Sequence, residues 1–126
     1  MILIDTDIII WNMRGHQRAA DFLAGNLGFS ISAVTYMELL QGLRNKAELK
    51  LLRQALHQWQ AQIINLDQRI SSRASFMVET YCLSHGQQMG DALISATAIE
   101  HNLPLASANI KHFQFLDDLT LIEFKP

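Results

Sequence analysis

The first eleven residues, Met1–Trp11, constrain this chain most, because two acidic residues interrupt an otherwise apolar run. The sequence reads MILIDTDIIIW, so Asp5 stands directly after the first apolar run. A short apolar run that ends at a polar break is typical of a buried strand in a parallel sheet with both faces covered. Ligands of open α/β sheets bind at the carboxyl ends of the strands, which makes Asp5 a candidate site residue. Asp is also a common helix N-cap, and for Asp5 taken alone the cap is the favoured interpretation.

Strand-like and helix-like patterns alternate along the rest of the chain. Short apolar or alternating runs predict further strands at residues 29–33, 63–66, 105–107 and 119–124, with 63–66 buried. Helices are predicted at about 16–27, 34–43, 46–60, 67–84 and 90–102. Alternating strands and helices predict an α/β fold, a single α/β/α sandwich around a mostly parallel sheet of about five strands. Because no linker or repeat breaks the pattern, we expect residues 1–126 to form one domain.

Composition and charge exclude several classes of protein. Ten Lys and Arg against twelve Asp and Glu give a net charge of −2, so no general basic field attracts nucleic acid. The single cysteine, Cys82, excludes an internal disulfide and a thiolate zinc site, and it suits a reducing cytoplasm. No apolar run reaches the roughly 18 residues that would span a membrane, and no positively charged stretch opens an export signal. We therefore expect a cytoplasmic protein that binds polyanions only through local cations or a metal ion.

Right-handed crossovers between parallel strands bring distant residues to one edge of a sheet. Asp5 follows the first predicted strand, and Asn109 follows the fourth. Glu38 lies one to two turns into the helix after the second strand, and Asp91 opens the helix before the fourth. These four side chains can therefore converge. Each also has a structural explanation, because Glu38 can close a capping box from Thr35, Asp91 suits a helix N-terminus and Asn109 a turn.

Four motifs carry these residues in order: DTD at 5–7, SAVTYMELLQG at 32–42, DALISATA at 91–98 and LASAN at 105–109. Together they resemble a PIN domain of the VapC toxin type, and the match covers the whole chain. The resemblance implies a metal-dependent endoribonuclease, usually the toxin of a toxin–antitoxin pair, with an acidic site at Asp5, Glu38, Asp91 and Asn109. This chain departs from the family at two positions. The family more often has Asn where Asp7 stands, and its fourth acidic position is here the neutral Asn109.

The residue types suit hydrolysis of a phosphodiester bond. Mg²⁺ or Mn²⁺ can activate the attacking water and stabilise charge on the phosphate, and such hard ions prefer carboxylate oxygens. We assign Asp5 and Asp91 as direct metal ligands. Glu38 is expected to bind the ion through water or to orient the attacking water. Asn109 is expected to hold a metal-bound water or the phosphate by hydrogen bonds.

Supporting residues and partners follow from the same interpretation. Thr6 and Ser107 are expected to position the acids. None of the five histidines falls in a motif, and all are interpreted as surface or structural residues: His16, His57, His85, His101 and His112. The resemblance implies an antitoxin whose flexible C-terminal segment places an Arg or Lys among Asp5, Glu38 and Asp91. RNA is the expected substrate, and the apolar, Leu-rich helices favour a homodimer.

Two other functions fit part of the pattern. The Asp5-Thr6-Asp7 triplet also looks like the opening of a haloacid-dehalogenase-type phosphatase, in which the first Asp is a covalent nucleophile. Ile9 stands where that motif prefers Thr or Val, and 126 residues are few for such a core. The second alternative is a non-catalytic, PIN-like binding module, with Asn109 as a sign of lost activity. The retained carboxylates argue against it.

Overall fold

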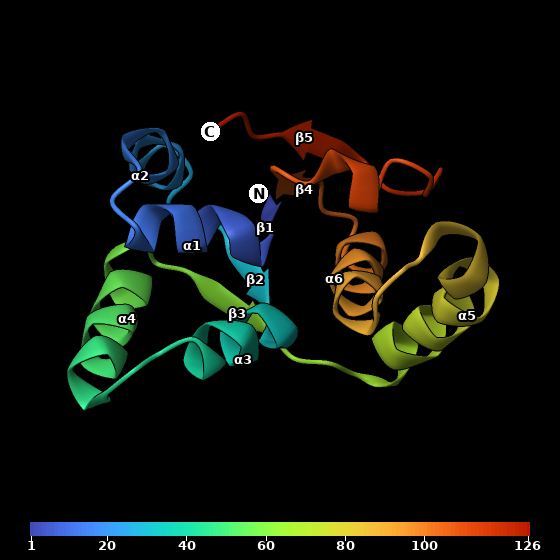
Figure 1. Cartoon of the computed structure of the whole chain (residues 1–126), viewed down its shortest axis with the longest axis horizontal. Coiled ribbons are helices and arrows are strands. Elements are labelled where there is room, and N and C mark those ends of the chain that lie inside the picture. Colours follow the sequence, from blue (N-terminus) through green and yellow to red (C-terminus); the bar gives the residue numbers. More distant parts are fainter.

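A five-stranded parallel sheet lies at the centre of the computed structural model, which describes all residues from 1 to 126 (Figure 1). Its strands are β1 (Leu3–Ile4), β2 (Ser30–Ser32), β3 (Gln62–Ile64), β4 (Leu105–Ser107) and β5 (Leu121–Glu123). They are ordered β3-β2-β1-β4-β5, and all neighbours are parallel. The central strand β1 therefore has Leu3 opposite both Ser30 of β2 and Leu105 of β4. This sheet confirms the predicted α/β fold.

Six α-helices and one 3₁₀ helix connect the strands. They are α1 (Thr6–Met13), α2 (Gln17–Ala24), α3 (Ala33–Gln41), α4 (Lys46–Gln58), α5 (Gln68–His85), α6 (Met89–Glu100) and η1 (Ile110–His112). Figure 1 shows α1, α2 and α4 grouped together, with α5 and α6 packed side by side away from them. No helix is both long and apolar enough to cross a membrane.

Alternating strand residues explain why helices cover both faces of the sheet. Successive side chains of a strand point to opposite faces. Leu3 and Leu105 pack into a core cluster with α5 and α6, whereas Ile4 and Ala106 pack into a second cluster with α1, α2 and α4. All four side chains are fully buried. The two clusters account for the sandwich, and they leave the carboxyl ends of β1 and β4 free for a site.

The third strand differs from its prediction. Residues 63–66 were expected to form a buried strand, but β3 spans Gln62–Ile64 and lies at the edge of the sheet. Ile63 remains 41% exposed. As an edge strand, β3 has a neighbouring strand on one side only, and its side chains are less covered than those of the central strands. An apolar run in the sequence therefore predicted a strand correctly but not its burial.

The long helix α5 begins and ends where the sequence predicts. The carboxylate of Asp67 accepts a hydrogen bond from the backbone N–H of Ile70 at 2.9 Å, which makes Asp67 the N-cap. Gly86 follows the helix with a φ of +64°, a left-handed conformation that glycine adopts without strain. The helix thus stops before the segment that leads to α6, whose first turn carries Asp91.

Candidate active site

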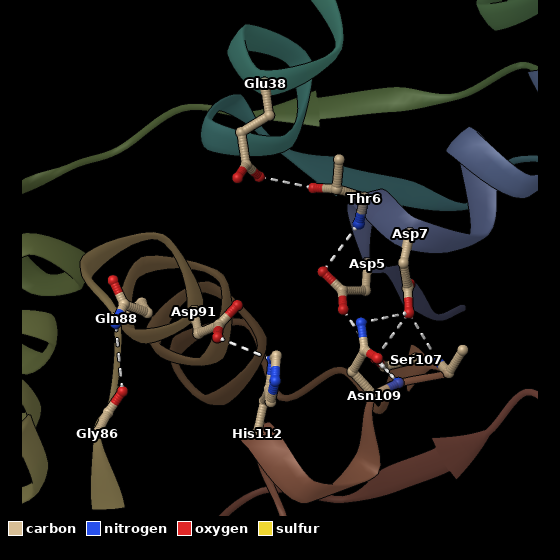
Figure 2. Close-up of polar contacts among 11 residues, drawn as sticks. Asp5, Thr6, Asp7, Glu38, Gly86, Gln88, Asp91, Ser107, Asn109 and His112 are labelled. Carbon is tan, nitrogen blue, oxygen red and sulfur yellow. Dashed lines mark hydrogen bonds and ion pairs between the residues drawn. The ribbon is translucent and has the colours of Figure 1, made fainter. Parts of the chain in front are cut away.

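An acidic pocket lies at the carboxyl ends of the central strands. It has a volume of about 490 Å³, and its lining includes Asp5, Asp7, Glu38, Asp91 and Asn109. Figure 2 shows that these side chains come from the end of β1 and the start of α1, from α3, from α6 and from the segment after β4. The structure thus brings together all four residues that the sequence singled out.

Asp5 is both a helix cap and a pocket residue. Its Oδ1 accepts a hydrogen bond from the backbone N–H of Thr6 at 2.8 Å, so it begins α1. Its Oδ2 accepts the hydroxyl hydrogen of Ser107 at 2.7 Å, and the residue is only 5% exposed. Because Ser107 ends β4, this contact depends on the pairing of β1 with β4. The cap and the site were alternatives in the sequence, and the structure shows that one carboxylate both caps α1 and lines the pocket.

Asp7 lies beside Asp5, although sequence reasoning did not place it in the site. Its Oδ2 accepts hydrogen bonds from the backbone N–H of Ala108 at 3.0 Å and from Nδ2 of Asn109 at 3.1 Å (Figure 2). The Ser107 hydroxyl lies 3.4 Å from the same oxygen. The other oxygen, Oδ1, is buried and has no partner. The second acid of the DTD triplet was the signal that could have identified this residue.

Glu38 reaches the pocket from α3. That helix begins after Ser32, whose hydroxyl accepts the backbone N–H of Val34 at 3.1 Å, so the proposed capping box from Thr35 to Glu38 is wrong. The hydroxyl of Thr6 instead donates to Oε1 of Glu38 at 2.7 Å. The Thr6 and Thr35 hydroxyl oxygens lie 2.9 Å apart, and the Thr35 side chain is fully buried. These contacts give Thr6 the positioning role that the sequence predicted for it.

Asp91 lies in the first turn of α6, and its Oδ2 is 3.2 Å from Nδ1 of His112 (Figure 2). His112 was interpreted as a surface or structural residue; it is exposed, but its ring also lines the acidic pocket. The helical turn η1 after β4 carries this ring back over the strand ends. A sequence signal existed, because His112 follows Asn109 by three residues in a turn. The other four histidines do not line the pocket.

Burial and mutual repulsion raise the pKa values of the pocket carboxylates. Burial is the main cause for Asp5 and, together with the charge of Asp7, raises its pKa from 3.8 to about 7. Burial also raises the pKa of Asp7, against the opposing hydrogen bond from the Ala108 N–H. The pKa of Asp91 is raised by burial and by Glu38, although His112 opposes this shift. No lysine or arginine lines the pocket.

The chemistry of these donors fits a hard divalent cation. Asp5, Asp7, Glu38 and Asp91 offer carboxylate oxygens to one pocket, and Oδ1 of Asp7 lacks any hydrogen-bond donor. The acids line the pocket without three of them converging on a single point. Shared binding of one ion would therefore require side-chain rotation, such as release of Asp91 from His112. Glu38 is exposed and Asp91 is half-buried, so both side chains have room to rotate toward an ion at Asp5.

Comparison with known proteins assigns the family. The PIN domain family matches residues 2–117. The chain is 35% identical to ribonuclease VapC10 of Mycobacterium tuberculosis over 123 residues, which cover 94% of this chain and 90% of that protein. It is 36% identical over 125 residues to ribonuclease VapC19 of the same organism, with coverage of 94% and 97%. A chain in a toxin–antitoxin complex from Klebsiella pneumoniae is 29% identical and superimposes with a TM-score of 0.81 over 98% of this chain and 100% of that chain. The chain therefore belongs to the PIN-domain family, among the ribonucleases of the VapC type.

Proposed function

We propose that this chain is a metal-dependent endoribonuclease that acts as the toxin of a toxin–antitoxin pair. The observation that carries the proposal is the pocket itself, in which four carboxylates face one another at the strand ends without a lysine or arginine. Two relatives named as ribonucleases and a related chain within a toxin–antitoxin complex support the same function. RNA, itself an anion, can approach such a pocket only when a cation offsets its charge.

Each pocket residue has a distinct task in phosphodiester hydrolysis. Asp5 and Asp91 would hold Mg²⁺ or Mn²⁺. The bound ion supplies positive charge for the phosphate and lowers the pKa of water. Glu38 is fixed through Oε1 by the Thr6 hydroxyl, which leaves Oε2 to orient the attacking water and accept its proton.

The two alternative functions receive less support. A haloacid-dehalogenase-type phosphatase needs a lysine beside its aspartates, and no lysine lines this pocket. The PIN domain match over residues 2–117 also speaks against it. A non-catalytic binding module would have no use for three carboxylates whose pKa values are raised by burial.

A cleavage assay with stripped protein tests the proposal. The purified, partner-free chain is treated with EDTA and incubated with a labelled RNA, first without and then with added Mg²⁺ or Mn²⁺. We expect cleavage only after the ion is added, and no cleavage by Asp91→Asn under any condition. Asp118→Asn, an exposed acid outside the pocket, is the matched control and should cut like the wild type. Cleavage that is unaffected by EDTA would refute the metal dependence.

A groove between α1 and α4 suits the antitoxin segment. The acidic pocket shares Ile10 and Glu38 with a neighbouring pocket, which in turn shares Met13 and Glu48 with a third. The third pocket is mainly apolar, and an extended segment can follow all three in line. Apolar contacts at the far end would supply most of the affinity.

At the near end of this groove, a basic side chain of the partner can replace the metal ion. An Arg would fit best among Asp5, Glu38 and Asp91, because its planar fork engages carboxylates bidentately. Truncating that Arg or Lys to Ala in a co-purifying partner should leave the complex intact but raise residual cleavage when Mg²⁺ is added. An equally silent complex with and without the basic side chain would contradict this form of inhibition.

The homodimer is proposed to use another surface, the apolar pocket between α3 and α6. Met37 and Met89 are 49% and 72% exposed there, next to Leu40 and Leu93. Exposed apolar patches of this kind are typical of interfaces. Light scattering should give twice the chain mass for the wild type and a monomer for Met37→Asp.

The free, half-buried thiol of Cys82 suits the reducing cytoplasm in which we place the protein.

A further inference from the structure

One hydrogen bond joins the two positions at which this chain departs from its family. The resemblance to the VapC-type PIN domain implies Asn at position 7 and a fourth acid at position 109, where this chain has Asp7 and Asn109. In the structure, Nδ2 of Asn109 donates to Oδ2 of Asp7 at 3.1 Å (Figure 2). The two positions are therefore in direct contact, with the carboxylate at the start of α1 and the amide after β4.

The surroundings of Asp7 leave one of its oxygens free for a ligand. Oδ2 is occupied by the Ala108 N–H and by Asn109. The Ser107 hydroxyl, which donates to Asp5, also lies near Oδ2. Oδ1 is buried without any partner. A buried carboxylate oxygen without a donor is unfavourable unless a cation or water satisfies it.

We propose that Asp7 supplies the fourth carboxylate of the site and contacts the divalent ion through Oδ1, while Asn109 holds Asp7 in place as a positioning residue. The inference rests on the proposed metal-dependent function. With Asp7 the pocket contains four carboxylates, although position 109 is neutral.

A purely structural role would favour Asn rather than Asp at position 7. An Asn oxygen would accept the same hydrogen bond from the Ala108 N–H, and it would add no negative charge beside Asp5. The carboxylate instead places a further negative charge in the pocket beside Asp5 and Asp91. The resulting repulsion is offset only when a cation enters the pocket. The charge at Asp7 is therefore explained by a ligand and not by the fold.

Direct measurement of metal binding tests this assignment. Calorimetric titration with Mn²⁺ would be applied to the wild type, Asp7→Asn, Asn109→Asp and the double variant that swaps both. We expect Asp7→Asn to weaken Mn²⁺ binding on the order of tenfold or more. The double variant should recover most of that affinity, because the carboxylate returns on the other side of the contact. Asp118→Asn is the control for removing a negative charge elsewhere, and circular dichroism checks that each variant folds.

The outcomes separate this inference from the proposed function. If the wild type binds Mn²⁺ and Asp7→Asn binds it equally well, the role of Asp7 is refuted while the metal-dependent nuclease stands. If Asp7→Asn binds weakly and the double variant does not recover, the exchange between the two positions is refuted. If the wild type binds no Mn²⁺ at all, both proposals are overturned.

Discussion

Two regions of this molecule bury carboxylates, and they treat the charge in opposite ways. Between α5 and α6, the Glu100 side chain is only 12% exposed, and both Arg69 and Arg73 pair with it. At the strand ends, Asp5 is 5% exposed and has Asp7 as a neighbour, and the pocket contains no lysine or arginine, only His112 beside Asp91. The chain therefore provides two arginines where a carboxylate joins two helices, but it places no lysine or arginine in the acidic pocket.

The difference teaches how a site can be recognised from electrostatics. Ion pairs between helices stabilise the fold without outside help. Unpaired, clustered carboxylates destabilise the fold until a cation arrives, whether as a metal ion or as a basic side chain of a partner. Removing a carboxylate from the acidic pocket should therefore preserve or raise the stability and lower cleavage. Removing the charge of Glu100 should lower the stability and leave cleavage unchanged.

The largest effect is expected for Asp5→Asn. Asn retains the N-cap of α1, so the fold should survive, whereas loss of a direct ligand should lower cleavage by at least about 100-fold. Thermal melting in EDTA should show equal or greater stability than the wild type, because one buried negative charge is gone. Cleavage comparable to that of the wild type at saturating Mg²⁺ would remove Asp5 from the site.

The second prediction concerns pH in the absence of metal. Because the pKa of Asp5 rises from 3.8 to about 7, the folded protein holds this proton more tightly than the unfolded chain. The resulting stability is present at low pH and is lost as the pH rises through about 7, at about 1.4 kcal/mol per unit of pKa shift. Urea unfolding in EDTA should give a free energy that falls between about pH 4 and about pH 7, and Asp5→Asn should flatten this slope. A free energy that rises over this interval would contradict the prediction.

Glu100→Gln probes the paired region and should act in the opposite direction. Removing the charge leaves Arg73 without its partner, and we expect a loss of about 1–2 kcal/mol in the free energy of unfolding. Cleavage of RNA should be unchanged, because Glu100 does not line the acidic pocket. A large fall in cleavage without loss of stability would break the distinction between the two regions.

The smallest effect is expected for His112→Ala. The ring is 55% exposed and touches the pocket only through Asp91, so kcat/KM should fall by less than about tenfold. His57→Ala, an exposed histidine outside the pocket, serves as the control. A loss as large as that of Asp5→Asn would mean that His112 balances the charge of Asp91, as Arg73 balances the charge of Glu100.

Apolar periodicity and the rules of parallel sheets predicted the fold and indicated that Asp5, Glu38, Asp91 and Asn109 could meet, and the resemblance to a PIN domain then made them the expected site. Both signals are long-range regularities, so they survive local variation. Burial of β3 was not predictable in this way, because a strand pattern does not say whether a neighbour lies on each side.

Two pocket residues were missed for a different reason. Asp7 and His112 enter the pocket through the first turn of α1 and through η1, and turn geometry at that scale is not encoded in hydrophobic patterning. In the sequence, a helix cap and a site residue were alternative interpretations of Asp5, but one carboxylate can cap a helix and also line a pocket. Whether a helix cap also lines a pocket depends on the three-dimensional arrangement of the strands and helices.

The central position of β1 has a consequence for the time at which this protein becomes active. Its partner strand β4 and the Ser107 hydroxyl that orients Asp5 stand 102 residues further along the chain. Translation therefore produces Asp5 and Glu38 well before the strand whose Ser107 orients Asp5 exists, and Asp91 follows shortly before that strand. A nascent chain still tethered to the ribosome, surrounded by ribosomal and messenger RNA, has no assembled pocket until its final segments have emerged.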